Sequence, residues 1–314
     1  MSAILLAITD WDPEAWLARF HAEANGREVR LWPEIGDPAA IDYACVWKQP
    51  AGLLARFPNL KAIFSLGAGV DHLLSDRSLP AAPVVRIVDP DLTSRMTGYV
   101  ALHVLLHQRK MKLYEAQRRE RAWRDQYEVP PDQVRVGVMG VGVLGTAAAQ
   151  MLRQLGFRVA GFSRSPKTMP GIETFAGEAG MGAFLGRSDI LVCLLPLTTE
   201  TRGILRYDLF RRLARDGALG GPVLINAGRG GLQVEADILR ALGDGTLAAA
   251  SLDVFEHEPL PPTSPMWDHP KVYVTPHNAA SSAPRALVKN VMNQIERFER
   301  GLGLEHIVDR TLGY

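Results

Sequence analysis

The sequence predicts an α/β protein of two domains, each built around a parallel sheet with helices on both of its faces. Three observations predict this class. Short apolar runs typical of strands alternate with helical patterns along the whole chain. The 314 residues suffice for two domains, at roughly 100–200 residues per domain. A composition of 47% hydrophobic and 22% charged residues is that of a globular protein.

The expected strands are short runs rich in valine, isoleucine, leucine and alanine, and they form two series. Between the first two strands we expect a helix with Asp12 as its N-cap and Pro13 at its first position, ending near Gly26. The first series comprises residues 4–8, 29–32, 43–47, 62–66 and 84–88, and the second comprises 134–140, 159–163, 190–196, 223–228, 248–255 and 272–276.

Residues 95–124 have no glycine or proline after Gly98, which predicts one long helix. The second half of this segment is rich in arginine and lysine. Because the net charge is only +1, a solvated face or a subunit interface explains these charges better than nucleic-acid binding. His103 and His107 are four residues apart, a spacing seen in metal sites, but no third ligand accompanies them. We therefore expect a structural role for both histidines.

The last predicted helix begins at Pro284, with Ser281 or Ser282 as its cap, and ends before Gly301. Its apolar residues recur at helical spacing, which predicts one face packed on the core. These residues are Leu287, Val288, Val291, Met292, Ile295 and Phe298.

Cysteine usage and the apolar runs predict a cytoplasmic protein. Cys45 and Cys193 lie in separate apolar runs, as expected of buried free thiols in a reducing compartment. The N-terminus lacks the basic region of a signal peptide. The longest apolar run, residues 190–197, is shorter than the roughly 20 residues of a membrane span. We expect neither a membrane nor a nucleic-acid partner, and the near-neutral charge leaves small anionic substrates possible.

A glycine-rich turn follows the first strand of the second series. Gly140, Gly142 and Gly145 have the G-x-G-x-x-G spacing, and a helical pattern begins directly after them. The first glycine permits a tight turn, the second lets the backbone approach a pyrophosphate, and the third lets the helix pack on the strand. In this strand–turn–helix context the motif predicts dinucleotide binding.

The segment FSRSPK at residues 162–167 predicts which dinucleotide is bound. The residue that contacts the adenosine ribose is expected roughly 20 positions after the turn, at the end of the next strand. Ser163 occupies that place, and no acidic residue stands there. Ser163, Arg164, Ser165 and Lys167 offer hydroxyls and two cations, which suit the 2′-phosphate of NADP. The alternative is an NAD enzyme in which this basic loop is merely exposed.

Three further segments end predicted strands and carry polar side chains typical of catalysis. They contribute Arg229, Glu258 and His277. Because ligands of open α/β sheets bind at the carboxyl ends of strands, these side chains are expected to converge. An arginine can bind a carboxylate and polarise a carbonyl, a histidine can deliver a proton, and a carboxylate beside the histidine fixes its orientation. This combination suits hydride transfer to a 2-oxo acid, although each residue alone is also compatible with a structural role.

These motifs together resemble the D-2-hydroxyacid dehydrogenase family over nearly the whole chain, and most closely its glyoxylate/hydroxypyruvate reductase A branch. The motifs that carry the resemblance are SLGAGVDHLL (65–74), GVMGVGVLG (137–145), FSRS (162–165), LPLTTET (195–201), NAGRGG (226–231), LDVFEHEPLPPTSPMWDHP (252–270), TPHNAA (275–280) and the final GY.

The resemblance implies roles for individual residues. Arg229, Glu258 and His277 match the family's substrate-binding arginine, catalytic acid and proton donor, and Asp253 matches an aspartate that contacts the nicotinamide carboxamide. The neighbouring His257 and His269 match no catalytic motif. The cofactor-binding set comprises Gly140, Gly142, Val143, Leu144, Gly145, Ser163, Arg164, Ser165, Lys167, Leu195, Pro196, Thr201, Ala227, Gly228 and Asp253, and the substrate-binding set comprises Trp47, Gly67, Ala68, Gly69, Val70 and Arg229. Trp47 is alternatively a core residue. No metal is implied.

The resemblance also implies a domain plan. A Rossmann cofactor domain, residues 99–283, is inserted in a flavodoxin-like substrate domain made of residues 1–98 and 284–314. Catalysis is expected in the cleft, with closure bringing the Gly67–Val70 loop toward His277. A homodimer is expected, with the helix near 95–124 as a candidate interface.

The function that follows is NADPH-dependent reduction of a small 2-oxo acid, such as glyoxylate or hydroxypyruvate, to the 2-hydroxy acid. One alternative is an NADH-dependent dehydrogenase of the same family that acts on a bulkier 2-oxo acid. Another is a non-catalytic NAD(P)-binding sensor or corepressor. The intact Arg229, Glu258 and His277 argue against a sensor.

Overall fold

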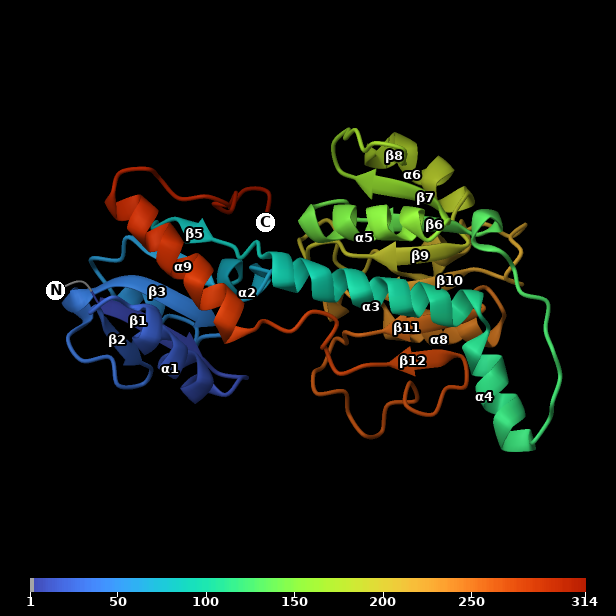
Figure 1. Cartoon of the computed structure of the whole chain (residues 1–314), viewed down its shortest axis with the longest axis horizontal. Helices are drawn as coiled ribbons and strands as arrows, with labels where there is room; N and C mark the ends of the chain where they lie inside the picture. Colours follow the sequence, from blue (N-terminus) through green and yellow to red (C-terminus); the bar gives the residue numbers. More distant parts are fainter. Residues whose placement is uncertain (1–2) are drawn as a thin grey trace. The chain divides into compact units, whose positions relative to one another are not determined.

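The computed structural model describes residues 3–314, and the chain divides into two compact units (Figure 1). Unit 1 comprises the residues up to Leu92 together with Ser282–Tyr314. Unit 2 comprises Thr93–Ser281. Each unit contains a parallel sheet, so the predicted fold class is confirmed.

Unit 1 is built on a parallel sheet with the strand order β2-β1-β3-β4-β5 among the described residues. Its strands are β1 (Ala3–Ile8), β2 (Glu28–Leu31), β3 (Ile41–Trp47), β4 (Ala62–Ser65) and β5 (Val84–Val85). Its helices are α1 (Pro13–Glu23), α2 (Asp71–Leu74) and α9 (Pro284–Glu299), with 3₁₀ turns at Pro38–Ala40 and Leu54–Arg56.

The ends of α1 and α9 show why these segments are helical. Asp12 caps α1 by accepting a hydrogen bond from the backbone N–H of Glu14, as the sequence predicts. Pro284 begins α9 as predicted, and the helix stops before Gly301, whose φ of +76° suits glycine. The predicted serine cap of α9 is wrong, because the capping position is Ala283 and makes no side-chain hydrogen bond.

Helices cover both faces of the sheet in unit 1. On one face, α1 and α9 pack against each other and bury Trp16, Phe20 and Leu287 with apolar residues of β1, β3 and β4. On the other face, the 3₁₀ turn at Leu54–Arg56 and α2 bury Leu54 and Leu73. Strands buried on both faces explain the almost uninterrupted apolar runs in the sequence.

Unit 2 is built on a parallel sheet with the order β12-β11-β10-β9-β6-β7-β8 among the described residues. Its strands are β6 (Arg135–Met139), β7 (Arg158–Ser163), β8 (Glu173–Ala176), β9 (Ile190–Cys193), β10 (Val223–Asn226), β11 (Ala249–Leu252) and β12 (Val272–Val274). Its helices are α3 (Pro90–Gln108), whose first turn precedes the boundary of unit 2, α4 (Met111–Glu120), α5 (Val143–Gln154), α6 (Gly177–Gly186), α7 (Tyr207–Phe210) and α8 (Glu235–Gly243), with 3₁₀ turns at Pro131–Gln133 and Gly230–Leu232.

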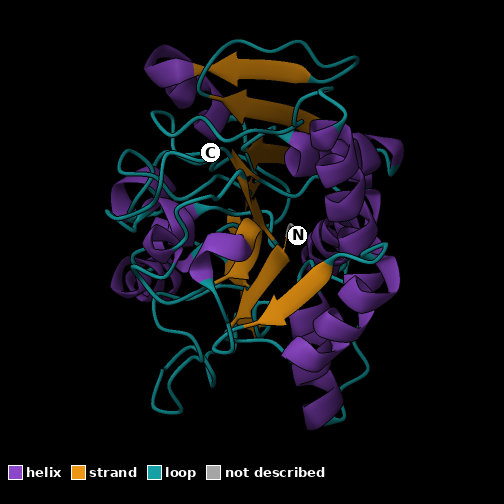
Figure 2. Cartoon of the chain, turned by 90° about the vertical axis from the view of Figure 1, so that its left-hand side faces the viewer, coloured by secondary structure: helices purple, strands orange, loops and turns teal. Residues whose placement is uncertain are grey.

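Helices flank this second sheet as well, and Figure 2 shows the strands between helical layers. On one face, α3 and α5 bury Val100, Val104 and Ala148 against β6 and β9. On the other face, α6 and α8 bury Phe184 and Ile238. Strand order reverses between β6 and β9, because the chain runs outward to β8 on one side and to β12 on the other. Such a switch point opens a crevice at the carboxyl ends of the strands, where ligands bind.

The prediction of one helix over residues 95–124 is wrong. The chain forms α3 and α4, separated at Lys110, which adopts the left-handed conformation with φ of +55°. Tyr127 and Glu128, in the segment that follows α4, contact the residues at this break. Arg109 pairs with Glu128 at 2.7 Å, and the ammonium group of Lys110 donates to the carbonyl of Tyr127 at 3.1 Å. The sequence shows no glycine or proline at the break, and the contacts made there involve residues from beyond α4.

Strand β8 was not predicted. Its sequence, ETFA, is short and half-exposed, and it lies at the edge of the sheet beside β7. Within the part of the chain that the structure describes, none of the helices combines the length and apolar character needed to cross a bilayer.

Candidate active site

The predicted site residues of unit 2 lie at the carboxyl edge of its sheet. The glycine turn follows β6, the FSRSPK segment ends β7, and Leu195 follows β9. Arg229 follows β10, Asp253 and Glu258 follow β11, and His277 follows β12. Parallel strands bring these loops to one edge, which is where the switch point opens.

The glycine turn has the geometry that a dinucleotide needs. Gly140 has a φ of +105°, and a Cβ there would lie 2.7 Å from the backbone of Leu194. A Cβ on Gly145 would lie 2.0 Å from the carbonyl oxygen of Gly140, so α5 can approach β6 only with glycine. A Cβ on Gly142 would meet nothing within 4 Å, and this residue caps α5 without a side-chain hydrogen bond. Open space in front of a helix N-terminus fits a pyrophosphate.

The FSRSPK segment places its cations beside this turn. Arg164 is exposed, and the ammonium group of Lys167 donates to the carbonyl of Val141 at 2.9 Å, which links the segment to the glycine turn. The hydroxyl of Ser163 donates to the carbonyl of Ser165 at 2.7 Å, so in this structure its hydrogen orients the loop. The absence of a carboxylate here favours an anionic 2′-substituent, because a phosphate needs cations and hydroxyls.

The loop after β9 is closed by its own side chains. The Thr201 hydroxyl donates to the carbonyl of Pro196 at 2.7 Å and accepts from the N–H of Thr198 at 2.8 Å. Glu200, in the same loop, has its pKa lowered first by a hydrogen bond to Thr198 and further by the charge of Arg164. Arg164 therefore lies within electrostatic range of this loop.

The loop that carries Arg229 is held by buried polar side chains. The Asn226 side chain accepts from the N–H of Gly228 at 3.1 Å and donates to Gln233 at 2.8 Å. Gln233 in turn donates to the carbonyl of Val254 at 2.9 Å, which ties this loop to the one after β11. A Cβ on Gly230 would lie 1.9 Å from the carbonyl oxygen of Phe255. The two loops therefore lie in direct contact, and Arg229 is fixed beside the loop of Glu258.

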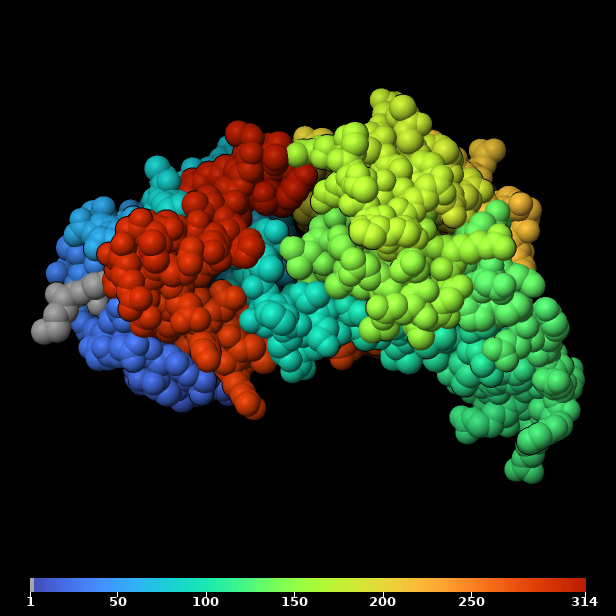
Figure 3. Space-filling view, turned by 45° about the horizontal axis from the view of Figure 1, so that its top comes forward, coloured from blue at the N-terminus to red at the C-terminus, as the bar shows by residue number. Residues whose placement is uncertain are grey.

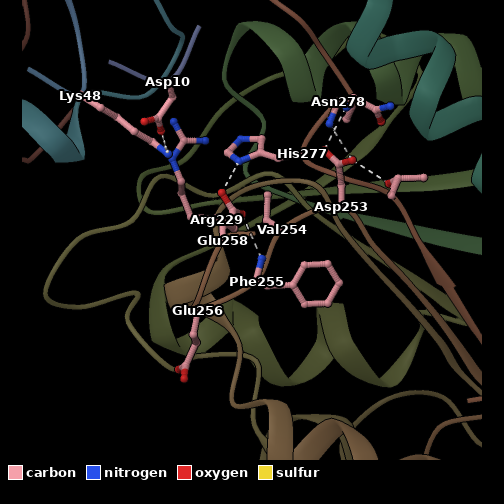
Figure 4. Close-up of polar contacts among 12 residues, drawn as sticks. Asp10, Lys48, Arg229, Asp253, Val254, Phe255, Glu256, Glu258, His277 and Asn278 are labelled. Atoms are coloured by element: carbon pink, nitrogen blue, oxygen red, sulfur yellow. Dashed lines mark hydrogen bonds and ion pairs between the residues drawn. The ribbon is translucent and has the colours of Figure 1, made fainter. Parts of the chain in front are cut away.

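His277 and Glu258 form the central pair of the site (Figure 4). The Nδ1 of His277 lies 2.7 Å from Oε2 of Glu258, and Oε1 of Glu258 accepts from the N–H of Phe255 at 3.1 Å. His277 adopts the left-handed conformation with φ of +52°, which is uncommon outside glycine and is often found at functional sites. Its N–H donates to the carbonyl of Asp253 at 2.8 Å, which holds this conformation.

This pairing fixes the chemistry of the imidazole. An ionised carboxylate only accepts hydrogen bonds, so Nδ1 of His277 carries a hydrogen toward Glu258. The other ring nitrogen, Nε2, is then the atom that gives or takes a proton. The His277 and Glu258 side chains expose 33% and 24% of their surface, so a small molecule can reach them.

Asp253 is almost fully buried and holds the loop of His277. Its Oδ1 accepts from the Thr275 hydroxyl at 2.6 Å and from the N–H of Asn278 at 3.0 Å, and its Oδ2 accepts from the N–H of Ala279 at 2.9 Å. The Thr275 oxygen lies 2.9 Å from the Tyr99 hydroxyl. Because Thr275 donates to the carboxylate, it accepts from Tyr99. A hydrogen-bonded chain thus connects α3 to the loop that presents His277.

In unit 1, the predicted substrate-binding residues form one cluster at the end of β4. Trp47 is 7% exposed and stacks on Trp11, with 4.7 Å between ring centroids. A Cβ on Gly67 would lie 2.1 Å from the Trp47 ring, so the ring packs directly against the Gly67–Val70 loop. The structure therefore places Trp47 as a support of this loop.

Comparisons with known proteins place the chain in a family. Residues 101–279 match the family model for the NAD-binding domain of the D-isomer specific 2-hydroxyacid dehydrogenases. A glyoxylate/hydroxypyruvate reductase A from Serratia proteamaculans is 40% identical over 97% of both chains.

The chain belongs to the D-isomer specific 2-hydroxyacid dehydrogenases.

Solved structures resemble this dehydrogenase over its full length. The NADPH-dependent glyoxylate/hydroxypyruvate reductase of Sinorhizobium meliloti, solved with NADP and sulfate, is 51% identical, covers 100% of both chains and has a TM-score of 0.96. A probable 2-hydroxyacid dehydrogenase of Rhizobium etli, solved with NADP, HEPES and L(+)-tartaric acid, is 44% identical, covers 100% of this chain and 99% of its own, and has a TM-score of 0.95. The predicted family and branch are confirmed.

The two histidines of α3 contact a single serine in this dehydrogenase. His103 Nδ1 and His107 Nε2 each lie 2.8 Å from the Ser251 hydroxyl. The hydroxyl has one hydrogen, so one imidazole accepts it and the other donates. Burial lowers the pKa of His103 to about 4 and that of His107 to about 3, so both are neutral at physiological pH.

Several residues that shape the site were not singled out from the sequence. They are buried polar side chains or glycines whose partners lie far along the chain: Asn226, Gly230, Gln233, Thr275, Tyr99 and Ser65. The only sequence signal for them is a polar residue at or just after the end of an apolar strand, as with Ser65 and Asn226.

Proposed function

We propose that the protein is an NADPH-dependent reductase of a small 2-oxo acid, glyoxylate or hydroxypyruvate, which it converts to the 2-hydroxy acid. The observation that carries this proposal is the 2.7 Å contact of His277 with Glu258, at the same sheet edge as Arg229 and the glycine turn. The curated and structural relatives that share the whole chain length carry the same activity in their names.

In this mechanism Arg229 holds the substrate carboxylate and polarises the carbonyl. The forked N–H donors of its guanidinium group suit one carboxylate oxygen and the carbonyl oxygen. His277 delivers a proton from Nε2 to the carbonyl oxygen as the oxygen becomes an alkoxide. Glu258 accepts from Nδ1, which keeps the ring oriented and stabilises the charged imidazolium until the proton leaves. The bond at Asp253 keeps the His277 backbone in its left-handed conformation throughout.

NADPH supplies the hydride when it is bound. The open space at Gly142 and the uncapped start of α5 suit its pyrophosphate. Arg164, with Ser163, Ser165 and Lys167 beside it, suits its 2′-phosphate. The remaining proposed contacts lie in the loops that follow the same strands, at Val143, Leu144, Leu195, Pro196, Thr201, Ala227, Gly228 and Asp253.

We also propose separate roles for the two units. Unit 2 binds the cofactor and carries Arg229, Glu258 and His277. Unit 1 contributes the Gly67–Val70 loop, whose backbone N–H groups bind the substrate carboxylate. The chain passes from one unit to the other near residues 92 and 282, and each unit has its own sheet and core. This organisation allows the two units to have separate roles.

A homodimer is proposed from the apolar surface of α4 and the segment that follows it. Trp123 is 101% exposed and Tyr127 is 71% exposed, and Met111 and Leu113 on α4 are exposed as well. This segment stands out from the rest of unit 2 in Figure 3, in green. Large exposed apolar side chains that recur within one segment favour a protein partner, and a second copy is the partner proposed here.

The oligomeric state tests the dimer. Sedimentation analysis at micromolar concentration should give a dimer for the wild-type protein and a monomer for Trp123→Glu with Leu113→Glu. Leu302, another exposed apolar residue, lies after α9 and supplies the control Leu302→Glu. A wild-type monomer, or a dimer that survives the double substitution, would contradict this interface.

A cytoplasmic location is proposed from the two cysteines. Cys45 and Cys193 are buried free thiols whose pKa values are raised by burial, so neither is poised to form a disulfide. Cell fractionation would test this.

Initial rates with NADPH and NADH, each with a series of 2-oxo acids from glyoxylate upward, test the reaction. The proposal expects fast oxidation of NADPH with a small acid. Faster turnover with NADH and a bulkier acid would instead indicate another branch of the family. Tight NADPH binding without turnover of any acid would indicate a sensor.

A further inference from the structure

Ser65, the last residue of β4, is fully buried and makes two hydrogen bonds to the loop that follows it. Its hydroxyl oxygen lies 3.0 Å from the carbonyl oxygen of Gly67 and 3.1 Å from that of Gly69. A hydroxyl has a single hydrogen, so Ser65 shares it between the two carbonyls. One side chain therefore sets the orientation of two peptide groups in the Gly67–Val70 loop.

The orientation of these carbonyls determines where the next N–H groups point. The peptide bonds of this loop are trans, and in a trans peptide the N–H lies opposite to the C=O. The carbonyls of Gly67 and Gly69 face Ser65, so the N–H groups of Ala68 and Val70 face away from it. Across the described residues, these two N–H groups donate to no acceptor.

Trp47 supports the same loop from another side. A Cβ on Gly67 would lie 2.1 Å from the Trp47 ring, so the loop backbone rests on the indole. Trp11 stacks on that ring, and the His72 ring meets its edge at 4.8 Å between centroids. The loop is therefore backed by a packed aromatic cluster and has little room to change its course.

Two backbone donors with no acceptor among residues 3–314, in a partly exposed loop at the carboxyl end of a parallel strand, are suited to an anion. A carboxylate suits such a site because it offers two oxygens and needs donors that are already oriented. The side chain that orients the donors does not itself need to touch the anion.

We propose that Ser65 is the positioning residue of the substrate carboxylate site. By holding the carbonyls of Gly67 and Gly69 inward, it keeps the N–H groups of Ala68 and Val70 turned toward the bound acid. This inference rests on the proposed function, because it takes the carboxylate of a 2-oxo acid as the ligand of the loop. Ser65 acts through the backbone and makes no contact with the reacting atoms.

The test is Ser65→Ala, with two measurements on the NADPH-loaded enzyme. The first is calorimetric titration with oxamate, a carboxylate that is not reduced as a 2-oxo acid is. Its binding should be weakened about tenfold, which is the scale of one lost hydrogen bond to a charged ligand. Glyoxylate reduction should show KM raised by about the same factor with kcat nearly unchanged, since binding is lost equally in the ground and transition states. NADPH affinity should not change.

Two further variants separate positioning from general stability. Ser188→Ala removes another fully buried serine hydroxyl, one that donates to the carbonyl of Phe184 in unit 2. It should lower the melting temperature without changing oxamate binding. Ser65→Cys nearly keeps the side-chain volume but has a weaker donor, so its oxamate affinity should lie between those of the wild type and Ser65→Ala. Because it fills the same space, it should stay folded even if Ser65→Ala does not.

The outcomes distinguish this inference from the proposed function. Oxamate affinity unchanged in folded Ser65→Ala or in Ser65→Cys would overturn the role of Ser65, even if the wild-type enzyme reduces glyoxylate. If the wild-type protein reduces no 2-oxo acid but binds oxamate in a Ser65-dependent way, the proposed function fails and the inference about Ser65 stands. A wild-type protein that binds no oxamate overturns the inference.

Discussion

At the scale of single residues, the site depends on one acid–base pair and one basic loop. His277 is oriented by Glu258 through Nδ1, which leaves Nε2 as the atom that we propose donates the proton. Arg164 is an exposed cation of the loop after β7, where many dinucleotide-binding proteins carry an acidic residue. Each of these arrangements predicts a specific loss when one side chain is removed.

Removing the proton donor should abolish most of the turnover. We expect His277→Ala to lower kcat by a factor of about 10² to 10⁴, the usual contribution of a general acid. NADPH affinity should change little, because the imidazole acts on the substrate. His257→Ala is the matched control, since His257 lies in the same loop as Glu258 but outside the acid–base pair. Steady-state kinetics and cofactor titration measure both effects, and a wild-type kcat in His277→Ala would remove His277 from the mechanism.

Removing the cation at the end of β7 should change cofactor preference. Arg164→Ala should weaken NADPH binding by about 1.5–3 kcal/mol, the range for a lost charge-assisted contact. NADH binding should change far less, because NADH lacks the 2′-phosphate. Arg158→Ala, at the other end of the same strand, is the control. Equal losses for both cofactors in fluorescence titrations would show that Arg164 does not bind the phosphate.

At the scale of elements, the loops after β10, β11 and β12 behave as one assembly. Gln233 ties the first loop to the second, and Asp253 ties the second to the third. The chain of hydroxyls from Tyr99 through Thr275 to Asp253 adds α3 to this assembly. The position of His277 therefore depends on side chains that never reach the substrate.

Removing the middle hydroxyl of this chain should lower catalysis without touching the substrate. We expect Thr275→Val to reduce kcat/KM about tenfold, because the Asp253 carboxylate loses a donor and the His277 loop gains freedom. Thr275→Ser, which keeps the hydroxyl, should retain most of the activity. Both variants should be compared well below their melting temperatures. Equal kcat/KM for the valine and serine variants would contradict the positioning role.

Sequence patterns predicted most elements because strands buried on both faces leave apolar runs that are easy to recognise. Strand β8 was not predicted because an edge strand with half-exposed side chains lacks such an apolar run. The break at Lys110 was not predicted because no glycine or proline marks it, and its contacts with Glu128 and Tyr127 are visible only in the structure. Arg229, Glu258 and His277 stand out by motif, whereas Ser65 and Gln233 become meaningful only when the structure shows their partners.

At the scale of the whole molecule, two buried histidines contribute to how the stability of the protein responds to acid. His103 and His107 have pKa values lowered mainly by burial, to about 4 and about 3. The unfolded chain takes up protons on these residues near their usual pKa of about 6.5. Between that pH and about 4, the unfolded state binds protons that the folded state does not. The free energy of unfolding must therefore fall as the pH falls through this window.

Urea denaturation at several pH values measures this dependence. Each neutral buried histidine should contribute a loss of about 2 kcal/mol between pH 8 and pH 5. His107→Gln, which can still hydrogen-bond to Ser251, should flatten the curve by about that amount while lowering stability at pH 8. His21→Gln, at an exposed position on α1, is the control. An unchanged acid slope in His107→Gln would show that His107 is protonated in the folded state.

The close approach at Gly230 has a consequence for anyone who wishes to redesign the enzyme. Any side chain at this position would collide with the backbone at Phe255, where a Cβ would lie 1.9 Å from the carbonyl oxygen. A mutant library that randomises position 230 together with Arg229 would therefore consist mostly of damaged proteins. New acid preferences are better sought by varying the side chain of Ala68, which is only partly buried and already carries a Cβ.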